Sequence, residues 1–211
     1  MVSESQKLKF YFVGNDRCLD FINTGVRAND QPLDLLTEFD DVLAWLAQGN
    51  ILGAEEAKAL GKRWAGKPEA EKTLRQAREL RGILRLMAER ITHGKSVPQA
   101  AVKAINDLLR NQVGYTELRR AKGNFEKRYH LNFDDPRRLL ILLAESASDL
   151  LCYADFSLIK QCENPACVLY FYDTTKNHTR RWCSMSMCGN RAKAAAHYRR
   201  VREAKHMVGN R

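Results

Sequence analysis

Four of the six cysteines in this 211-residue chain lie in one short C-terminal stretch. Cys162 and Cys167 form one pair, Cys183 and Cys188 form a second, and four residues separate the members of each pair. Two short pairs of thiolates can supply the four tetrahedral sulfur ligands that a structural zinc ion prefers. Because four sulfurs leave no coordination position for a substrate, the spacing predicts one structural Zn²⁺ ion and no catalytic metal.

Other chemistries of paired cysteines fit this pattern less well. Disulfides are rare in the reducing cytosol, which is the compartment expected for this chain. Redox pairs usually have two residues between their cysteines, whereas four separate them here. An iron–sulfur cluster is the main chemical alternative to zinc, and a set of buried free thiols is the simplest one.

The segments around the cysteines predict a small metal-dependent module. Between the two pairs, residues 168–183 are expected to form a β-hairpin, and residues 190–205 an alanine-rich helix of high intrinsic propensity. This order of knuckle, hairpin, knuckle and helix is typical of a treble-clef-like zinc finger. The module has few large apolar side chains, so the metal would replace a hydrophobic core. Tyr198 and Val201 lie on a helix face suited to packing against the hairpin.

Positive charge is concentrated in the same part of the chain. The net charge is +10, and residues 161–211 carry ten Lys or Arg against three Asp or Glu. Such a segment most often contacts a polyanion, with nucleic acid the first candidate. A solvated basic surface that only keeps the module soluble is the simpler alternative.

Side chains that could contact nucleic acid lie on the predicted zinc hairpin and on the last helix. Lys193, His197 and Arg200 share one helix face with alanines, a shape that allows close approach to a groove or a phosphate backbone. DNA is the predicted partner and RNA the alternative. The candidate contact residues are Lys176, Asn177, Arg180, Arg181, Asn190, Arg191, Lys193, His197 and Arg200.

The remainder of the chain predicts a mainly helical domain with one small β-hairpin. Apolar residues at helical spacing, with proline near the starts and glycine near the ends, indicate helices over 37–50, 54–66, 67–95, 97–112 and 135–154. Residues 114–133 alternate between apolar and polar side chains around Gly123 and Asn124, which is typical of a hairpin. Residues 135–154 are apolar almost all round, so they should form the central buried helix. We place the domain boundary between residues 1–155 and 156–211.

Polar residues interrupt an apolar stretch near the N-terminus. Asp20, Asn23, Thr24 and Asp34 lie among leucine, phenylalanine and isoleucine. Such residues can line a ligand pocket for a small-molecule effector, although they also cap helices and build turns. The ligand pocket is therefore one of two interpretations.

Several functional classes are not favoured by the sequence. We expect no membrane association and a cytoplasmic location, because the longest apolar run, Leu139–Ala144, has six residues against the roughly 20 that a membrane span needs. We also expect no enzyme activity, since the chain shows no nucleophile–base arrangement, phosphate-binding glycine loop or H-E-x-x-H motif. An enzyme site in the N-terminal domain is the least favoured alternative.

The cysteine stretch, with Cys188-Gly189-Asn190-Arg191 at its end, resembles the CGNR zinc-finger family. The upstream segments "CLDFINT", "DLLTEFDDVLAWL" and "ESASDLL" are similar to the ABATE-type domain that accompanies this finger in bacterial proteins. The resemblance implies a stress-linked transcriptional regulator with a DNA-binding zinc finger, Cys162, Cys167, Cys183 and Cys188 as metal ligands, and a basic signature at Arg180, Arg181, Arg191 and Lys193. An RNA-binding or ribosome-associated zinc protein is the alternative function, and a homodimer is a candidate assembly.

Overall fold

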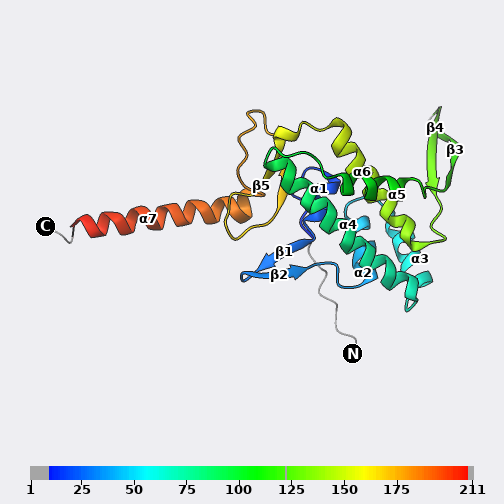
Figure 1. The fold of residues 1–211 in the computed structure, drawn as a ribbon, viewed down its shortest axis with the longest axis horizontal. Helices are drawn as coiled ribbons and strands as arrows, with labels where there is room; N and C mark the ends of the chain where they lie inside the picture. Colours follow the sequence, from blue (N-terminus) through cyan, green and yellow to red (C-terminus); the bar gives the residue numbers. More distant parts are fainter. Residues whose placement is uncertain (1–9, 122, 209–211) are drawn as a thin grey trace.

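The computed structural model describes residues 10–121 and 123–208 of the chain. Its helices are α1 (Arg17–Ile22), α2 (Phe39–Gln48), α3 (Ala54–Trp64), α4 (Pro68–Thr92), α5 (Gln99–Leu109), α6 (Leu139–Tyr153) and α7 (Asn190–Val208). Its strands are β1 (Gly25–Ala28), β2 (Gln31–Asp34), β3 (Gly114–Ala121), β4 (Asn124–Leu131), β5 (Ile159–Gln161) and β6 (Tyr170–Tyr172). Each consecutive pair of strands forms a two-stranded antiparallel sheet, so the fold is mainly helical, as predicted (Figure 1).

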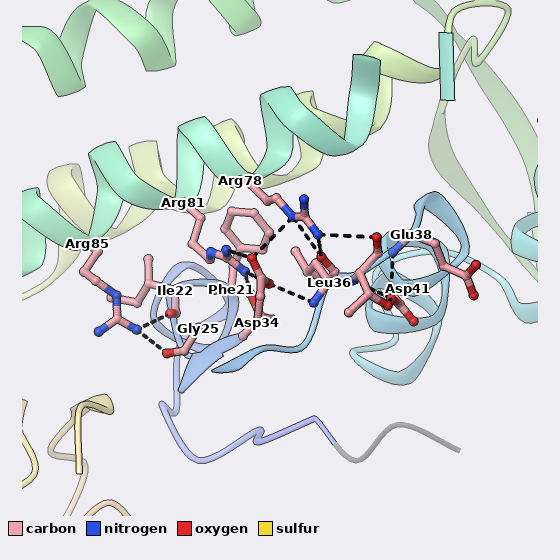
Figure 2. Close-up of polar contacts among 12 residues, drawn as sticks. Phe21, Ile22, Gly25, Asp34, Leu36, Glu38, Asp41, Arg78, Arg81 and Arg85 are labelled. Carbon is pink, nitrogen blue, oxygen red and sulfur yellow. Dashed lines mark hydrogen bonds and ion pairs between the residues drawn. The ribbon is translucent and has the colours of Figure 1, made fainter. Parts of the chain in front are cut away.

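Capping residues determine where the predicted helices begin and end. α2 begins one residue after Glu38, and the carboxylate of Asp41 accepts hydrogen bonds from the N–H groups of Thr37 and Glu38 (Figure 2). The helix predicted over 37–50 therefore begins two residues later than its predicted range. α4 has Pro68 in its first turn and is followed by Gly94, whose φ of +65° ends the helix as predicted.

α3 lies within the predicted range 54–66 and is continuous through Gly61. A Cβ atom at Gly61 would lie 3.3 Å from the carboxylate of Asp40 and 3.5 Å from a methyl group of Leu43, both on α2. The glycine thus allows α2 and α3 to pack closely at a cost of about 1 kcal/mol in helix propensity.

α6 is a buried helix of the hydrophobic core, as its apolar composition predicted, although α4 contacts more of the other elements. Its residues Leu139, Leu140, Leu143 and Ala144 are buried, and the helix packs against α1 and α5. The same core includes Ile159 of β5 and Tyr170 of β6. The cysteine-containing segment is therefore packed onto the helical body, not merely tethered to it.

Strand β6 joins two hydrophobic clusters. Side chains alternate between the two faces of a strand, and here Tyr170 packs into the main helical core, whereas Phe171 packs into a second cluster with three of the four paired cysteines. Tyr11, Val13 and Val26 from the N-terminal segment also contact this second cluster. Strand β6 thus lies between the two hydrophobic clusters and contributes a side chain to each of them.

Two elements project from the body. The β3–β4 hairpin forms as predicted, and Gly123 in its turn has φ of +88°, which favours glycine. α7 extends from the cysteine cluster into solvent (Figure 1). Tyr198 is 73% exposed and Val201 is 40% exposed, so the expected packing of this helix face against a hairpin over 168–183 is wrong. That hairpin is itself not formed, because β6 pairs with β5, which precedes the first cysteine pair. Among the described residues, none of these helices is both long and apolar enough to cross a membrane.

Candidate metal centre and basic surface

The fold brings the four paired cysteines together. Their Sγ atoms all lie within 4.8 Å of one another, and Cys162, Cys183 and Cys188 are buried. The Sγ atoms of Cys167 and Cys183 are 3.8 Å apart, and those of Cys183 and Cys188 are 3.5 Å apart. A tetrahedral zinc ion with Zn–S bonds of about 2.3 Å separates its sulfurs by about 3.8 Å, so the residues fit this ion.

Local turns point both pairs of sulfurs at one place. In the first knuckle, the N–H of Cys167 donates to the carbonyl of Asn164 at 2.8 Å, and the side chain of Asn164 accepts from the N–H of Ala166. In the second, a π-helical turn over Met185–Gly189 leads into α7, with the N–H of Cys188 donating to the carbonyl of Ser184. Each pair thus uses its four intervening residues to close one turn.

Gly189 lies where the chain packs closely. A Cβ atom there would lie 2.6 Å from the sulfur of Met185 and 3.3 Å from the ring of Trp182. A side chain at this position would therefore displace the exposed end of Met185, and the backbone at Gly189 is not in the left-handed region. The first two residues of the Cys-Gly-Asn-Arg tetrapeptide therefore have separate roles, one in the cysteine cluster and one in the turn.

The electrostatic surroundings of the sulfurs favour negative charge on one of them. Hydrogen bonds from the thiols of Cys167 and Cys183 lower the pKa of Cys162, whereas the bond to Cys162 raises the pKa of Cys167 and of Cys183. The π-helical turn that leads into α7 begins two residues after Cys183, and free N–H groups at the start of a helical segment stabilise nearby anions. Since thiolates are the metal-binding form of cysteine, these surroundings suit a divalent cation.

Arg180, predicted to contact nucleic acid, is directed inward. Its guanidinium donates to the backbone carbonyls of Val13 at 2.7 Å, Trp182 at 3.0 Å and Cys183, and it stacks 4.1 Å from the ring centre of Phe171. It therefore ties the N-terminal segment to the second cysteine pair. Its predicted contact with nucleic acid is not favoured by this geometry.

The other candidate contact residues lie at the surface. Arg181 pairs with Glu163 and stacks over Trp182, which leaves its charge partly compensated. The eight exposed members of the predicted set are Lys176, Asn177, Arg181, Asn190, Arg191, Lys193, His197 and Arg200. Lys176 and Asn177 lie in a turn that borders an open hollow of about 730 Å³. Asn190, Arg191, Lys193, His197 and Arg200 lie in the first turns of α7.

Asp173, which was not among the predicted site residues, holds the turn of the zinc module in place. Its buried carboxylate accepts hydrogen bonds from Lys160 at 2.7 Å, from the hydroxyl and N–H of Thr175, and from the N–H of Arg180. Burial raises the pKa of Asp173, but these bonds outweigh it and hold the pKa well below its usual value. The spacing Asp-x-Thr is a turn signal that could have indicated this role.

The four polar residues of the predicted ligand pocket bond to other parts of the protein. Asp20 accepts from the N–H of Gly14 at 2.7 Å, and Thr24 donates to the carbonyl of Phe21. Asp34 pairs with Arg81, whose guanidinium also contacts Thr24, so the fold brings Thr24 and Asp34 together. Asp34 borders a hollow between α4 and the β1–β2 hairpin, and a pocket shared by all four stays a prediction.

Asn23 joins the helical body to the zinc module. Its carboxamide donates to the carbonyl of Tyr170 at 2.8 Å and accepts from the N–H of Tyr170 at 2.9 Å, and the residue is completely buried. The side chain of Asn23 thus supplies the hydrogen-bond donor and acceptor that a neighbouring strand would otherwise offer to Tyr170. The N–H of Tyr172 adds a bond to the carbonyl of Gly14.

We expect Asn23→Ala to lower the free energy of unfolding by about 3 kcal/mol, because it leaves one buried donor and one buried acceptor of Tyr170 without partners. Urea unfolding of the zinc-loaded protein measures this change. The exposed Asn111→Ala is the matched control, with an expected change below about 0.5 kcal/mol. Equal stabilities of the two variants would contradict the role assigned to Asn23.

The buried carboxyl of Asp20 should make stability depend on pH. Burial raises its pKa to about 6, whereas an unfolded aspartate titrates near 4. Folding therefore favours the protonated form, and this contribution is present below about pH 4 and is lost as the pH rises to about 6. Asp20→Asn cannot ionise, so it should exceed the wild type in stability by about 2 kcal/mol at pH 7 and match it near pH 4. Unfolding curves that keep one constant gap from pH 4 to pH 8 would refute this assignment.

Cys183→Ser tests the metal centre. We expect it to reduce the zinc content of the purified protein from one ion per chain to nearly none, because Cys183 lies within 4 Å of two other sulfurs. Since Ile159 and Tyr170 belong to the main core, zinc loss should also lower the stability of the helical body. Elemental analysis and thermal unfolding measure both effects. Cys152→Ser removes an exposed thiol and should change neither.

Comparison with known families agrees with this architecture. Residues 15–154 match the ABATE family, which carries the description "putative stress-induced transcription regulator", and residues 159–201 match the CGNR zinc finger. None of the curated proteins matches the chain. The chain belongs to the ABATE family and ends in a CGNR zinc finger whose four-cysteine cluster fits one structural Zn²⁺ ion.

Proposed function

We propose that this protein is a transcription regulator whose C-terminal zinc finger contacts DNA, while its N-terminal domain senses a small ligand or forms a homodimer. The observation that carries the proposal is α7, a basic helix that starts at the cysteine cluster and extends clear of the body (Figure 1). The family description supports a regulator and not an enzyme. The domains remain those that the sequence predicts, residues 1–155 and 156–211, and the two family matches support this division.

The shape and charge of α7 suit a duplex. Lys193, His197 and Arg200 are exposed, and the alanines between them leave the helix narrow on this side. The major groove of B-DNA is about 12 Å wide and admits one α-helix. Arg191 and Lys193 in the first turns could contact phosphates, which would fix the position of the helix.

RNA recognition receives less support from the structure. Proteins that read unpaired bases usually stack them on exposed aromatic side chains. Here Tyr170 and Phe171 are buried, and the ring of Trp182 is half-buried beneath Arg181. The aromatic residues between the two cysteine pairs are thus largely covered, and DNA is the favoured partner.

Selection from a random pool of duplex DNA tests the proposal. The full-length protein is used with zinc intact and, in parallel, after chelation. An enriched motif that disappears on chelation is the expected result, and a palindromic motif would indicate a dimer. Retention without any motif, or no retention at low salt, would overturn sequence-specific binding, and the selection would then be repeated with RNA.

Replacing Lys193 and Arg200 together with alanine tests the contact surface. Removing a side chain that contacts one phosphate should reduce the slope of log K against log salt by about 0.9, so the double variant should show a slope smaller by about 1.8. Fluorescence anisotropy with the selected duplex measures the slope. The control replaces Lys72 and Arg75, exposed residues of α4, and removes the same charge. Equal slopes for the two double variants would mean that α7 does not contact phosphate.

A further inference from the structure

An open hollow of about 460 Å³ lies between α4 and the β1–β2 hairpin. One wall is mostly apolar: it contains Val26, Pro32 and Leu33 of the hairpin and Val168 from the first cysteine knuckle, and Arg27 borders it. Leu33 is 45% exposed. The volume is in the range of small-molecule sites, which are mostly apolar with a few fixed polar groups.

Three arginines of α4 form the opposite wall. Arg78, Arg81 and Arg85 recur at helical spacing, and Figure 2 shows all three side chains extending from α4 toward the hairpin. Arg78 donates to the carbonyl of Leu36 at 2.6 Å, and Arg85 donates to the carbonyls of Ile22 and Gly25, both at 2.6 Å. The backbone thus fixes these guanidinium groups in place before any ligand binds.

The positive charge of this wall exceeds its negative charge. Asp34 is the single carboxylate that borders the hollow, and it pairs with Arg81 at 2.5 Å and with Arg78 at 3.3 Å. The Arg81 side chain is only 12% exposed. Burial, and to a lesser extent the charge of Arg81, lower the pKa of Arg85. Half-buried guanidinium groups that outnumber their carboxylate partners favour the binding of an anion.

Gly82 keeps the hollow open at the cost of helix stability. It lies on the same wall inside α4, where glycine costs about 1 kcal/mol relative to alanine. A Cβ atom at Gly82 would meet no atom within 4 Å, in contrast to the tightly packed Gly61 of α3. Packing among the described residues therefore does not require this glycine, whereas close approach of a ligand would.

We propose that this hollow binds a small organic anion, a carboxylate or a phosphate monoester that carries an apolar group. Its charged end would contact Arg85, since guanidinium groups match the geometry of these oxyanions, whereas Arg78 lies two turns away along α4, beyond Arg81 (Figure 2). Arg81 keeps its bond to Asp34 and holds the hairpin in position. The apolar group would cover Leu33, Val26 and Val168.

Such a ligand would touch both parts of the chain. Val168 follows Cys167 directly, and its carbonyl accepts a hydrogen bond from Arg85 at 3.0 Å. An anion beside Arg85 would thus change the contacts of the first cysteine knuckle. This regulatory consequence rests on the proposed DNA binding, whereas the binding of the anion does not.

Calorimetric titration with phenyl phosphate, inorganic phosphate and phenol tests the site on the full zinc-loaded protein. We expect saturable binding of phenyl phosphate, weaker binding of inorganic phosphate and none of phenol. Gly82→Gln places a side chain in the hollow without removing a charge, and it should weaken phenyl phosphate at least about ten-fold, a loss of about 1.4 kcal/mol. Leu86→Gln introduces the same side chain at an exposed position of α4 that does not line the hollow, and it should bind like the wild type.

No saturable binding of phenyl phosphate, or equal binding by both glutamine variants, would overturn the proposed site. A second measurement determines affinity for the selected duplex with and without phenyl phosphate. A change of at least about three-fold that Gly82→Gln abolishes is expected for a regulatory site. An unchanged affinity would refute the regulatory consequence alone, and absence of DNA binding without the anion would refute the proposed function instead.

Discussion

The pair of hydrogen bonds between Asn23 and the backbone of Tyr170 holds strand β6 against the helical body, and both hydrophobic clusters depend on that strand. Tyr170 points into the helical core and Phe171 into the cysteine cluster. A segment as short as the zinc module cannot bury enough apolar surface to fold alone. It is stabilised from one side by the metal site and from the other by the body.

Two arginines serve this construction directly. Arg180 satisfies carbonyls of the N-terminal segment and of the second cysteine pair, and Arg85 satisfies carbonyls of the α1–β1 connection and of the first knuckle. A planar guanidinium has five donors in a fixed fork, against three on a lysine ammonium, so it can bridge more carbonyls at once. The two halves of the chain are therefore joined mainly by side chains that bond to backbone.

The sequence was a good guide where the signal is local. Pro68 and Gly94 define the limits of α4, and the equal spacing of the cysteines predicts their cluster, because both depend on nearby residues. It was a poor guide where partners are distant in the chain. Asn23 lies 147 residues from Tyr170, and the arginines of α4 resemble the solvated face of any amphipathic helix until β1 and β2 are placed opposite them. Only the fold identifies the carbonyls and carboxylates that these side chains meet.

The isolation of α7 has a mechanical consequence. Nineteen residues of helix form a rod about 28 Å long, and the contacts that hold it are concentrated at its first turn, beside the cysteine cluster. Such a rod acts as a lever with its pivot at the metal. A slight rotation of the second knuckle is magnified in proportion to distance along the helix, so the far cations sweep the widest arc. The rigidity of the four-sulfur centre then determines how precisely the basic helix is oriented.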